Sequence, residues 1–84
     1  MSKSIFSDAY SLLRTWLVKA REKKGLTQAD VATKLGKPQS YVSKYERGER
    51  RLDVVEFLEV ARVLGVEPYK ILKELEKLDA KNNT

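Results

Sequence analysis

The chain has no cysteine and no histidine among its 84 residues. Without thiols or imidazoles it can form no disulfide, no thiolate or imidazole metal site, and no Ser-His or Cys-His catalytic arrangement. It also lacks a carboxylate pair in an apolar setting and a glycine-rich phosphate loop. We therefore expect a protein that is not an enzyme and that uses neither a cofactor nor a metal ion.

Long apolar runs are also missing. No stretch approaches the roughly 18 residues of a membrane span, and the first 19 residues lack the apolar core of a signal peptide. These absences predict a soluble cytoplasmic protein without a membrane partner. The composition of 42% hydrophobic and 35% charged residues provides enough apolar material for one small core. We expect a single domain over residues 1–84.

Positive charge is concentrated in the middle of the chain. Residues 1–18 carry a net charge of +1, and residues 52–84 carry −2. Residues 19–51 hold ten basic and four acidic side chains, a net charge of +6. Such a segment is either a solvated helical surface or the contact surface for a polyanion. The motif inside the segment favours the second interpretation.

Apolar residues recur at steps of three and four through most of the chain, which is the spacing of a buried helix face. No segment shows sustained two-residue alternation, so we expect an all-α fold without a sheet. Glycines and prolines divide the pattern into five segments. The predicted helices span residues 7–24, 28–35, 38–47, 53–64 and 67–78, with an N-terminal extension at 1–6 and a polar tail at 79–84.

Polar residues mark the starts of two of these helices. Thr27 precedes Asp30 by three residues, and Asp53 precedes Glu56 in the same way. In this pattern the first side chain and the later acidic side chain each bond the other residue's backbone amide. The helices at 28–35 and 38–47 are separated by the short sequence Gly-Lys-Pro, a length typical of two helices set at a steep angle.

One face of the predicted helix at 38–47 has no apolar residue to bury. Successive helical residues lie about 100° apart, so Val42 and Tyr45 share the side that faces the core. The opposite side offers an amide, two hydroxyls and an ammonium group, which are groups that read base edges in the major groove of DNA. These side chains belong to Gln39, Ser40, Ser43 and Lys44.

This face lies within a longer pattern: LTQADVA at 26–32, glycine at 36, QSYVSKYERG at 39–48 and VARVLGV at 60–66. The pattern resembles the lambda-repressor/Cro-type helix-turn-helix family, also called XRE-like, over about residues 10–75. The resemblance implies a five-helix lambda-repressor-like fold with its helix-turn-helix in the second and third helices. It also implies a transcriptional regulator that binds double-stranded DNA.

The resemblance assigns roles to individual side chains. Gln28 matches a position that contacts phosphate and bonds the first reading residue, and Gln39 and Ser40 match base-contacting positions. Lys44 matches a further reading position, where lysine favours guanine or a phosphate. Phosphate contacts are expected from Thr27, Arg47, Arg50 and Arg51. The whole candidate DNA-binding set is Thr27, Gln28, Lys37, Gln39, Ser40, Tyr41, Ser43, Lys44, Arg47, Arg50 and Arg51, each with the alternative of being a plain surface residue.

Tyr41 of this set and the neighbouring Pro38 differ from the other positions. Tyr41, at the edge of the reading face, either contacts a sugar-phosphate or a thymine methyl group, or packs within the protein. At Pro38 the family more often has serine or threonine, whose hydroxyl caps the helix. Proline supplies no such hydroxyl, and Lys37 is expected to compensate electrostatically.

Other residues have expected structural roles. Arg21 and Glu46 match family positions that form a partly buried ion pair between the first and third helices. Such a pair orients the reading helix without touching DNA. Trp16 and Leu12 lie off the main apolar stripe of their helix, and we expect them to pack against the helix at 67–78 or against Ile5 and Phe6.

The predicted regulator, a repressor by family habit, binds a pseudo-palindromic operator as a homodimer. One reading helix covers few base pairs, and a second copy about 34 Å away, one turn of DNA, multiplies specificity. The candidate dimer surface is Ile71, Leu75 and Leu78, although this stripe could equally close the monomer's own core. The alternative function is a protein-interaction adaptor or antitoxin-like module. Through DNA binding, the regulator would be associated with the nucleoid.

Overall fold

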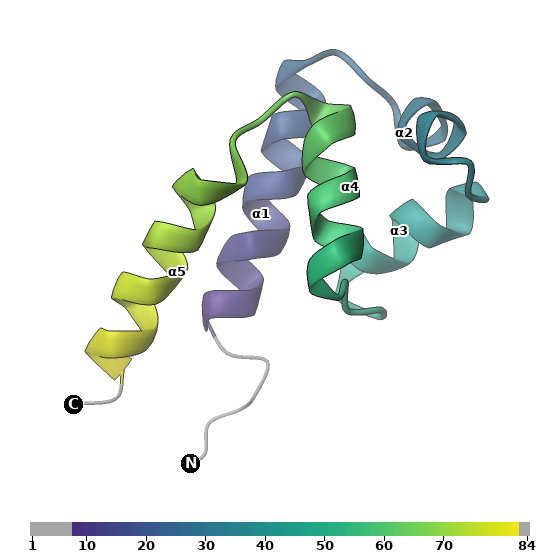
Figure 1. Ribbon diagram of the computed structural model, residues 1–84. Helices are drawn as coiled ribbons and strands as arrows, with labels where there is room; N and C mark the ends of the chain where they lie inside the picture. The colour runs from purple at the N-terminus through teal and green to yellow at the C-terminus, as the bar shows by residue number, and fades with distance from the viewer. Residues whose placement is uncertain (1–7, 83–84) are drawn as a thin grey trace.

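The computed structural model describes the backbone of residues 8–82 and the side chains of residues 9–78. This part of the chain forms five α-helices and no strand (Figure 1). They are α1 (Asp8–Lys23), α2 (Gln28–Leu35), α3 (Gln39–Arg47), α4 (Val54–Leu64) and α5 (Pro68–Asn82). None of these helices is long and apolar enough to cross a membrane.

The predicted helices agree with the structure except at the C-terminal end. α5 continues to Asn82, so the predicted end of this helix at residue 78 is wrong, and residues 79–82 of the polar tail are helical. No glycine or proline follows Pro68, and alanine and lysine near the end favour helix, so nothing in the sequence stops α5 earlier. The predicted extension at 1–6, with the expected contacts of Ile5 and Phe6, lies outside the described residues.

Reciprocal caps start α2 and α4, as the sequence predicts. The Thr27 hydroxyl accepts a bond from the Asp30 amide at 3.0 Å, and the Thr27 amide donates to the Asp30 carboxylate at 2.9 Å. Asp53 and Glu56 form the corresponding pair of bonds at 2.7 and 2.9 Å. Each cap satisfies amides that would otherwise lack a partner in the first turn of a helix.

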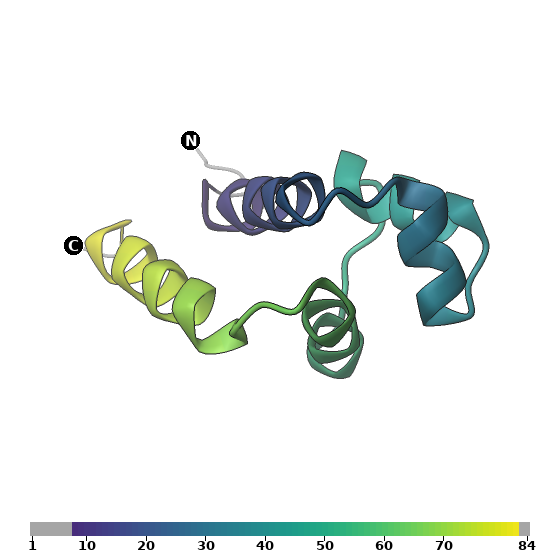
Figure 2. The ribbon, with the colours of Figure 1, turned by 90° about the horizontal axis from the view of Figure 1, so that it is seen from above.

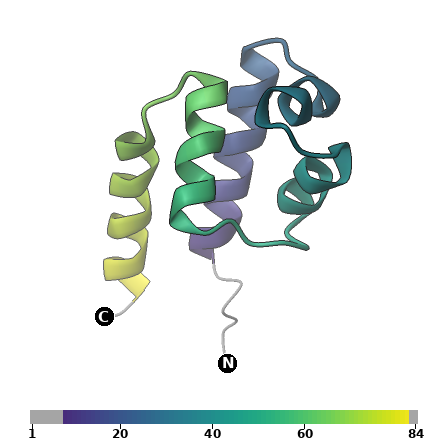
Figure 3. The same cartoon turned by 45° about the vertical axis from the view of Figure 1, so that its right-hand side comes forward.

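The helix α1 is the centre of the arrangement because it packs against α3, α4 and α5, while α2 packs against α3 and α4. Seen from above, α2 and α3 lie at one end of the molecule and α5 at the other (Figure 2). α4 and α1 run side by side between them (Figure 3). The helix-turn-helix of α2 and α3 therefore packs on α1 and α4, and α3 lies at the edge of the domain.

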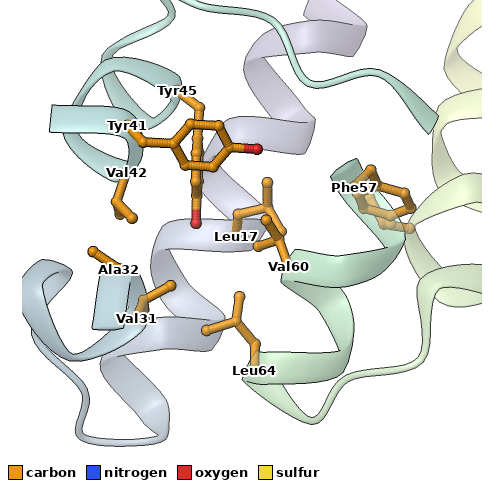
Figure 4. Close-up of a cluster of buried hydrophobic side chains, with 10 residues drawn as sticks. Leu17, Val31, Ala32, Tyr41, Val42, Tyr45, Phe57, Val60 and Leu64 are labelled. Carbon is orange, nitrogen blue, oxygen red and sulfur yellow. The ribbon is translucent and has the colours of Figure 1, made fainter. Parts of the chain in front are cut away.

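Apolar side chains from all five helices form one core (Figure 4). The predicted three- and four-residue spacing of a buried helix face is present in α4, where Phe57, Val60, Ala61 and Leu64 are buried. In α2, Val31 and Ala32 are buried and Leu35 is partly buried. Each fully buried aliphatic side chain contributes about 1.5–3 kcal/mol to stability. The buried apolar residues are Leu17, Val31, Ala32, Tyr41, Val42, Tyr45, Phe57, Val60, Ala61, Leu64 and Ile71.

The apolar stripe of α5 faces the monomer's own core. Ile71 is 2% exposed, and Leu75 is partly buried against the same core. Leu78 is half-buried. The candidate dimer surface of Ile71, Leu75 and Leu78 is therefore wrong for Ile71, because a second copy cannot reach a buried side chain. The alternative, that this stripe closes the monomer, accounts for Ile71 and Leu75.

Candidate nucleic-acid interface

The turn between α2 and α3 fixes the angle of the helix-turn-helix. Gly36 has a φ of 71°, the left-handed conformation that glycine adopts at little cost, and its amide bonds back to the last turn of α2. The amide of Lys37 donates to the carbonyl of Ala32 at 3.0 Å. Pro38 then occupies the cap position of α3 without a side-chain hydrogen bond, as its lack of a hydroxyl predicts.

The outward side of α3 is polar and solvent-facing. Gln39, Ser40 and Lys44 are exposed, and Ser43 is half-buried. On the opposite side, Val42 and Tyr45 are 0% and 1% exposed. The two-sided helix that the 100° spacing predicts is therefore present, and its outward groups are available to a partner.

A chain of polar contacts links α1 to this outward side. The Arg21 guanidinium donates to both oxygens of Glu46, from Nε at 2.7 Å and from Nη2 at 3.1 Å. The Gln28 amide also donates to Glu46, at 2.8 Å, and the Gln39 amide reaches the Gln28 oxygen at 3.5 Å. The bond expected between Gln28 and the first reading residue is thus present at the long limit for a hydrogen bond.

The Arg21–Glu46 pair is mostly shielded from water, as predicted. The side chains of Arg21 and Glu46 are 14% and 6% exposed. Arg21 also donates to the carbonyl of Leu26 at 2.9 Å, so the guanidinium fixes the chain between α1 and α2 as well. Its hydrogen bonds to Glu46 raise the pKa of Arg21 above the usual value. The pair holds α3 against α1.

Arg14 makes a second link from α1 to α3 that the helix-turn-helix pattern does not indicate. Its Nη1 donates to the backbone carbonyl of Glu46 at 2.9 Å, near the C-terminal end of α3. A cation there compensates the partial negative charge of the last carbonyls. Arg14 and Arg21 are seven residues apart, about two helical turns, and this spacing is the signal that could have identified Arg14.

The basic loop after α3 is held by acidic side chains. Arg47 donates to both oxygens of Glu49 at 2.9 Å and contacts the Ser43 hydroxyl. Arg50 donates to both oxygens of Glu56 at 3.0 and 2.8 Å. The hydrogen bonds from Arg50 lower the pKa of Glu56 to about 2. Two of the arginines expected to bind phosphates, Arg47 and Arg50, therefore have acidic partners within the protein.

Tyr41 lies deeper than the edge position that the sequence predicts. Its side chain is only 9% exposed, and its ring meets the ring of Tyr45 edge to face at 5.8 Å (Figure 4). The Lys37 ammonium and the Arg50 guanidinium lie 5.3 and 4.7 Å from the centre of the Tyr41 ring. Tyr41 thus takes its alternative role of packing within the protein, where it positions two cations of the candidate interface. Its contact with DNA stays a prediction.

Two further residues of the candidate set take structural roles as well. The hydroxyl oxygen of Thr27 accepts the capping bond at the start of α2, which leaves the hydroxyl hydrogen for a phosphate. The Arg51 guanidinium lies 4.5 Å from the centre of the Tyr10 ring of α1. The DNA contacts assigned to Thr27 and Arg51 stay predictions.

Comparisons with known proteins agree with this geometry. The model of the helix-turn-helix family HTH_3 matches residues 17–71. The chain is 39% identical over 59 residues to an uncharacterized HTH-type transcriptional regulator, y4dJ, of Sinorhizobium fredii. That match covers 70% of this chain and 77% of the relative.

Solved structures show the same fold. An XRE-family like protein from Pseudomonas syringae pv. tomato superposes with a TM-score of 0.78 and 47% identity, over 83% of this chain and 85% of that one. The restriction-modification controller protein C.Esp1396I, solved as a tetramer with its natural 35 base-pair operator, superposes with a TM-score of 0.72 and 30% identity, over 84% and 93%. The chain belongs to the XRE-type helix-turn-helix family of DNA-binding transcriptional regulators.

Proposed function

We propose that this regulator reads a specific operator by placing the outward side of α3 in the major groove of double-stranded DNA. The observation that carries the proposal is the exposed polar set Gln39, Ser40 and Lys44 on a helix whose other side is buried. The Gln39 amide suits adenine, and the Lys44 ammonium suits guanine or a phosphate. Ser40 can bond several base edges, so it adds less to the choice of sequence.

Cations around α3 supply affinity in this proposal. Lys37, Arg47, Arg50 and Arg51 would bind phosphates, together with Gln28 and the Thr27 hydroxyl at the start of α2. Binding would then exchange part of the Arg47–Glu49 and Arg50–Glu56 pairing for phosphate contacts. The Arg47–Glu49 pair is more than half exposed, so little stability is lost when it opens. The Arg50–Glu56 pair is 38% and 21% exposed, so its opening costs more.

We propose further that the operator is pseudo-palindromic and is bound by a homodimer that acts as a repressor associated with the nucleoid. The exposed apolar side of α4 supports the dimer, because Val54, Val55 and Leu58 are 74%, 65% and 41% exposed. The three residues fall within about 100° of one another on the helix. A second copy of the chain, placed two-fold symmetrically on this α4 patch (Val54, Val55 and Leu58), would cover it.

Selection of binding sites from a random DNA pool at about 150 mM salt tests the reading function. We expect enrichment of two inverted half-sites. Binding that disappears as salt rises, without any enriched sequence, would show phosphate attraction alone. That result would favour the alternative of a protein-interaction adaptor.

Substitutions assign the enriched bases to side chains. Gln39→Ala and Lys44→Ala should each lose about 1–3 kcal/mol of affinity and relax one operator position, if they read bases. Lys34→Ala is the matched control, because it removes one exposed lysine charge from α2 outside the candidate interface. An equal loss from Lys34→Ala would mean that net charge, and not the side of α3, governs binding.

A further inference from the structure

A second surface of the molecule has the character of a small-molecule site. A pocket of about 360 Å³ lies between the C-terminal half of α1 and the connection from α4 to α5. This α1–α5 pocket is lined by the apolar groups of Trp16, Ala20 and Val66, and by residues of α1, the connection and α5 only. Its volume falls within the roughly 300–1,000 Å³ of ligand pockets in proteins. Because none of the lining residues belongs to α2 or α3, the pocket lies outside the helix-turn-helix.

The apolar lining is attached to the core of the domain. Trp16, Ala20 and Val66 are partly buried and pack against the core cluster, so they form a fixed wall. Gly65 has no side chain to fill the space beside them. The ammonium of Lys24 lies 3.0 Å from the place that a Cβ at Gly65 would occupy.

Cations from two helices surround this wall. Lys19 and Lys23 of α1 and Lys70 of α5 line the pocket, and Glu67 is the one acidic side chain in the lining. Within the described part of the chain none of these three lysines forms an ion pair. Lys19 and Lys23 are four residues apart on one helix, a spacing at which like charges repel. An anion placed among the lysines would relieve that repulsion.

We propose that the α1–α5 pocket binds a small amphipathic carboxylate, a medium-chain or aryl acid. Its apolar body would cover Trp16 and Val66, and its carboxylate would lie among Lys19, Lys23 and Lys70. The apolar wall gives affinity by removing hydrocarbon from water, and the lysines select for negative charge. No residue of α2 or α3 lines this pocket, so the site is separate from the proposed DNA interface.

Fluorescence gives a direct test because Trp16 is the single tryptophan of the chain and lines the pocket. The full chain is titrated with octanoate below its micelle-forming concentration, with calorimetry in parallel. We expect a saturable change in Trp16 emission. Acetate lacks the apolar body and 1-octanol lacks the charge, so both should bind far more weakly. Equal binding of 1-octanol, or no saturable signal with octanoate, overturns the proposal.

Charge substitutions locate the site. Lys19→Gln and Lys70→Gln should each weaken octanoate binding up to about fivefold, the upper range for one exposed charge pair. Lys73→Gln is the matched control, because it removes the same charge from α5 outside the lining of the pocket. Helical circular dichroism verifies that each variant is folded. An equal loss from Lys73→Gln, or no loss from Lys19→Gln and Lys70→Gln, rejects the site.

Discussion

Arg21 and Glu46 form the most enclosed ion pair among the described residues, with side chains 14% and 6% exposed. Removal of one partner leaves the other charge without its counter-ion in a site that water reaches poorly. Arg21→Met should therefore lower the free energy of unfolding by about 3 kcal/mol. Urea denaturation followed by circular dichroism measures the loss.

Arg47 provides the control for this prediction. Its pair with Glu49 has side chains 55% and 54% exposed, so Arg47→Met should cost much less than Arg21→Met. The double variant Arg21→Met/Glu46→Leu should recover much of the loss, because no unpaired charge remains. Equal stability of Arg21→Met and the wild type would mean that the pair does not hold α1 to α3.

Tyr45 carries a buried hydroxyl that has no hydrogen-bond partner among the described residues. The side chain is 1% exposed, and its burial raises the pKa of the phenol. Tyr45→Phe removes this hydroxyl and keeps the ring. We expect the free energy of unfolding to stay equal or to rise by about 1 kcal/mol, since an unsatisfied buried polar group is costly.

Thermal and urea denaturation of Tyr45→Phe test this expectation. Tyr45→Leu serves as the contrast, because it also loses the edge-to-face contact with Tyr41 and leaves a cavity. A clear loss of stability in Tyr45→Phe would show that the hydroxyl has a partner in solution.

Side-chain pairings between distant residues were the hardest part to predict. The Arg21–Glu46 pair follows from matched family positions, whereas local spacing gives no sign of the Arg50–Glu56 bond. The spacing from Arg21 places Arg14 on the same side of α1 but does not identify the Glu46 carbonyl as its partner. Their geometry depends on how the loop after α3 folds. The depth of Tyr41 depends on the same loop, because Arg50 lies over its ring.

At the scale of elements, the start of α4 depends on Glu56. This carboxylate accepts two bonds from Arg50 and one from the Asp53 amide, and so joins the loop after α3 to α4. The bonds from Arg50, with that from Asp53, lower the pKa of Glu56 from 4.5 to about 2. A carboxyl group with a lowered pKa in the folded state stabilises the fold only while it is ionised.

The pH dependence of stability follows from this shift. The contribution of Glu56 is fully present above its unfolded pKa, near 4.5, and is lost as the pH falls through about 2. The difference in urea midpoint between wild type and Glu56→Gln should therefore be constant near neutral pH and shrink between those limits. Glu59→Gln removes an exposed acid from the same helix as a control. A difference that stays constant down to pH 2 would contradict the role of Glu56.

Helix boundaries were predictable because each signal is local. Capping pairs such as Thr27–Asp30 and the glycines that follow three of the helices depend on neighbouring residues alone. The C-terminal end of α5 is the exception, since its sequence has no such stop signal. The face of α5 was not decidable, because the stripe of Ile71 and Leu75 fits an internal core as well as a dimer.

At the scale of the whole molecule, the sequence identifies which side of α3 is free but not which surface meets another copy. Exposure on α3 follows from the 100° spacing within one helix, whereas exposure on α4 depends on which neighbours cover it. α5 packs on α1 and leaves Val54, Val55 and Leu58 of α4 open, and the periodicity of α4 gave no sign of this.

The α4 patch gives the last prediction, which concerns assembly. If a second copy covers the patch, Leu58→Asp places an unpaired carboxylate in an apolar interface. The dissociation constant of the dimer should rise at least about tenfold, a cost of about 1.4 kcal/mol, as measured by sedimentation equilibrium. Affinity for a two-half-site operator should fall with it, while affinity for a single half-site should not change.

Leu72→Asp separates this interface from a general effect of surface charge. Leu72 is 44% exposed, close to the 41% of Leu58, but it lies on α5 outside the patch. Leu72→Asp should therefore leave the dimer intact. If Leu72→Asp dissociates the dimer and Leu58→Asp does not, the second copy docks on α5, and the two α3 helices must reach their half-sites from a different two-fold axis.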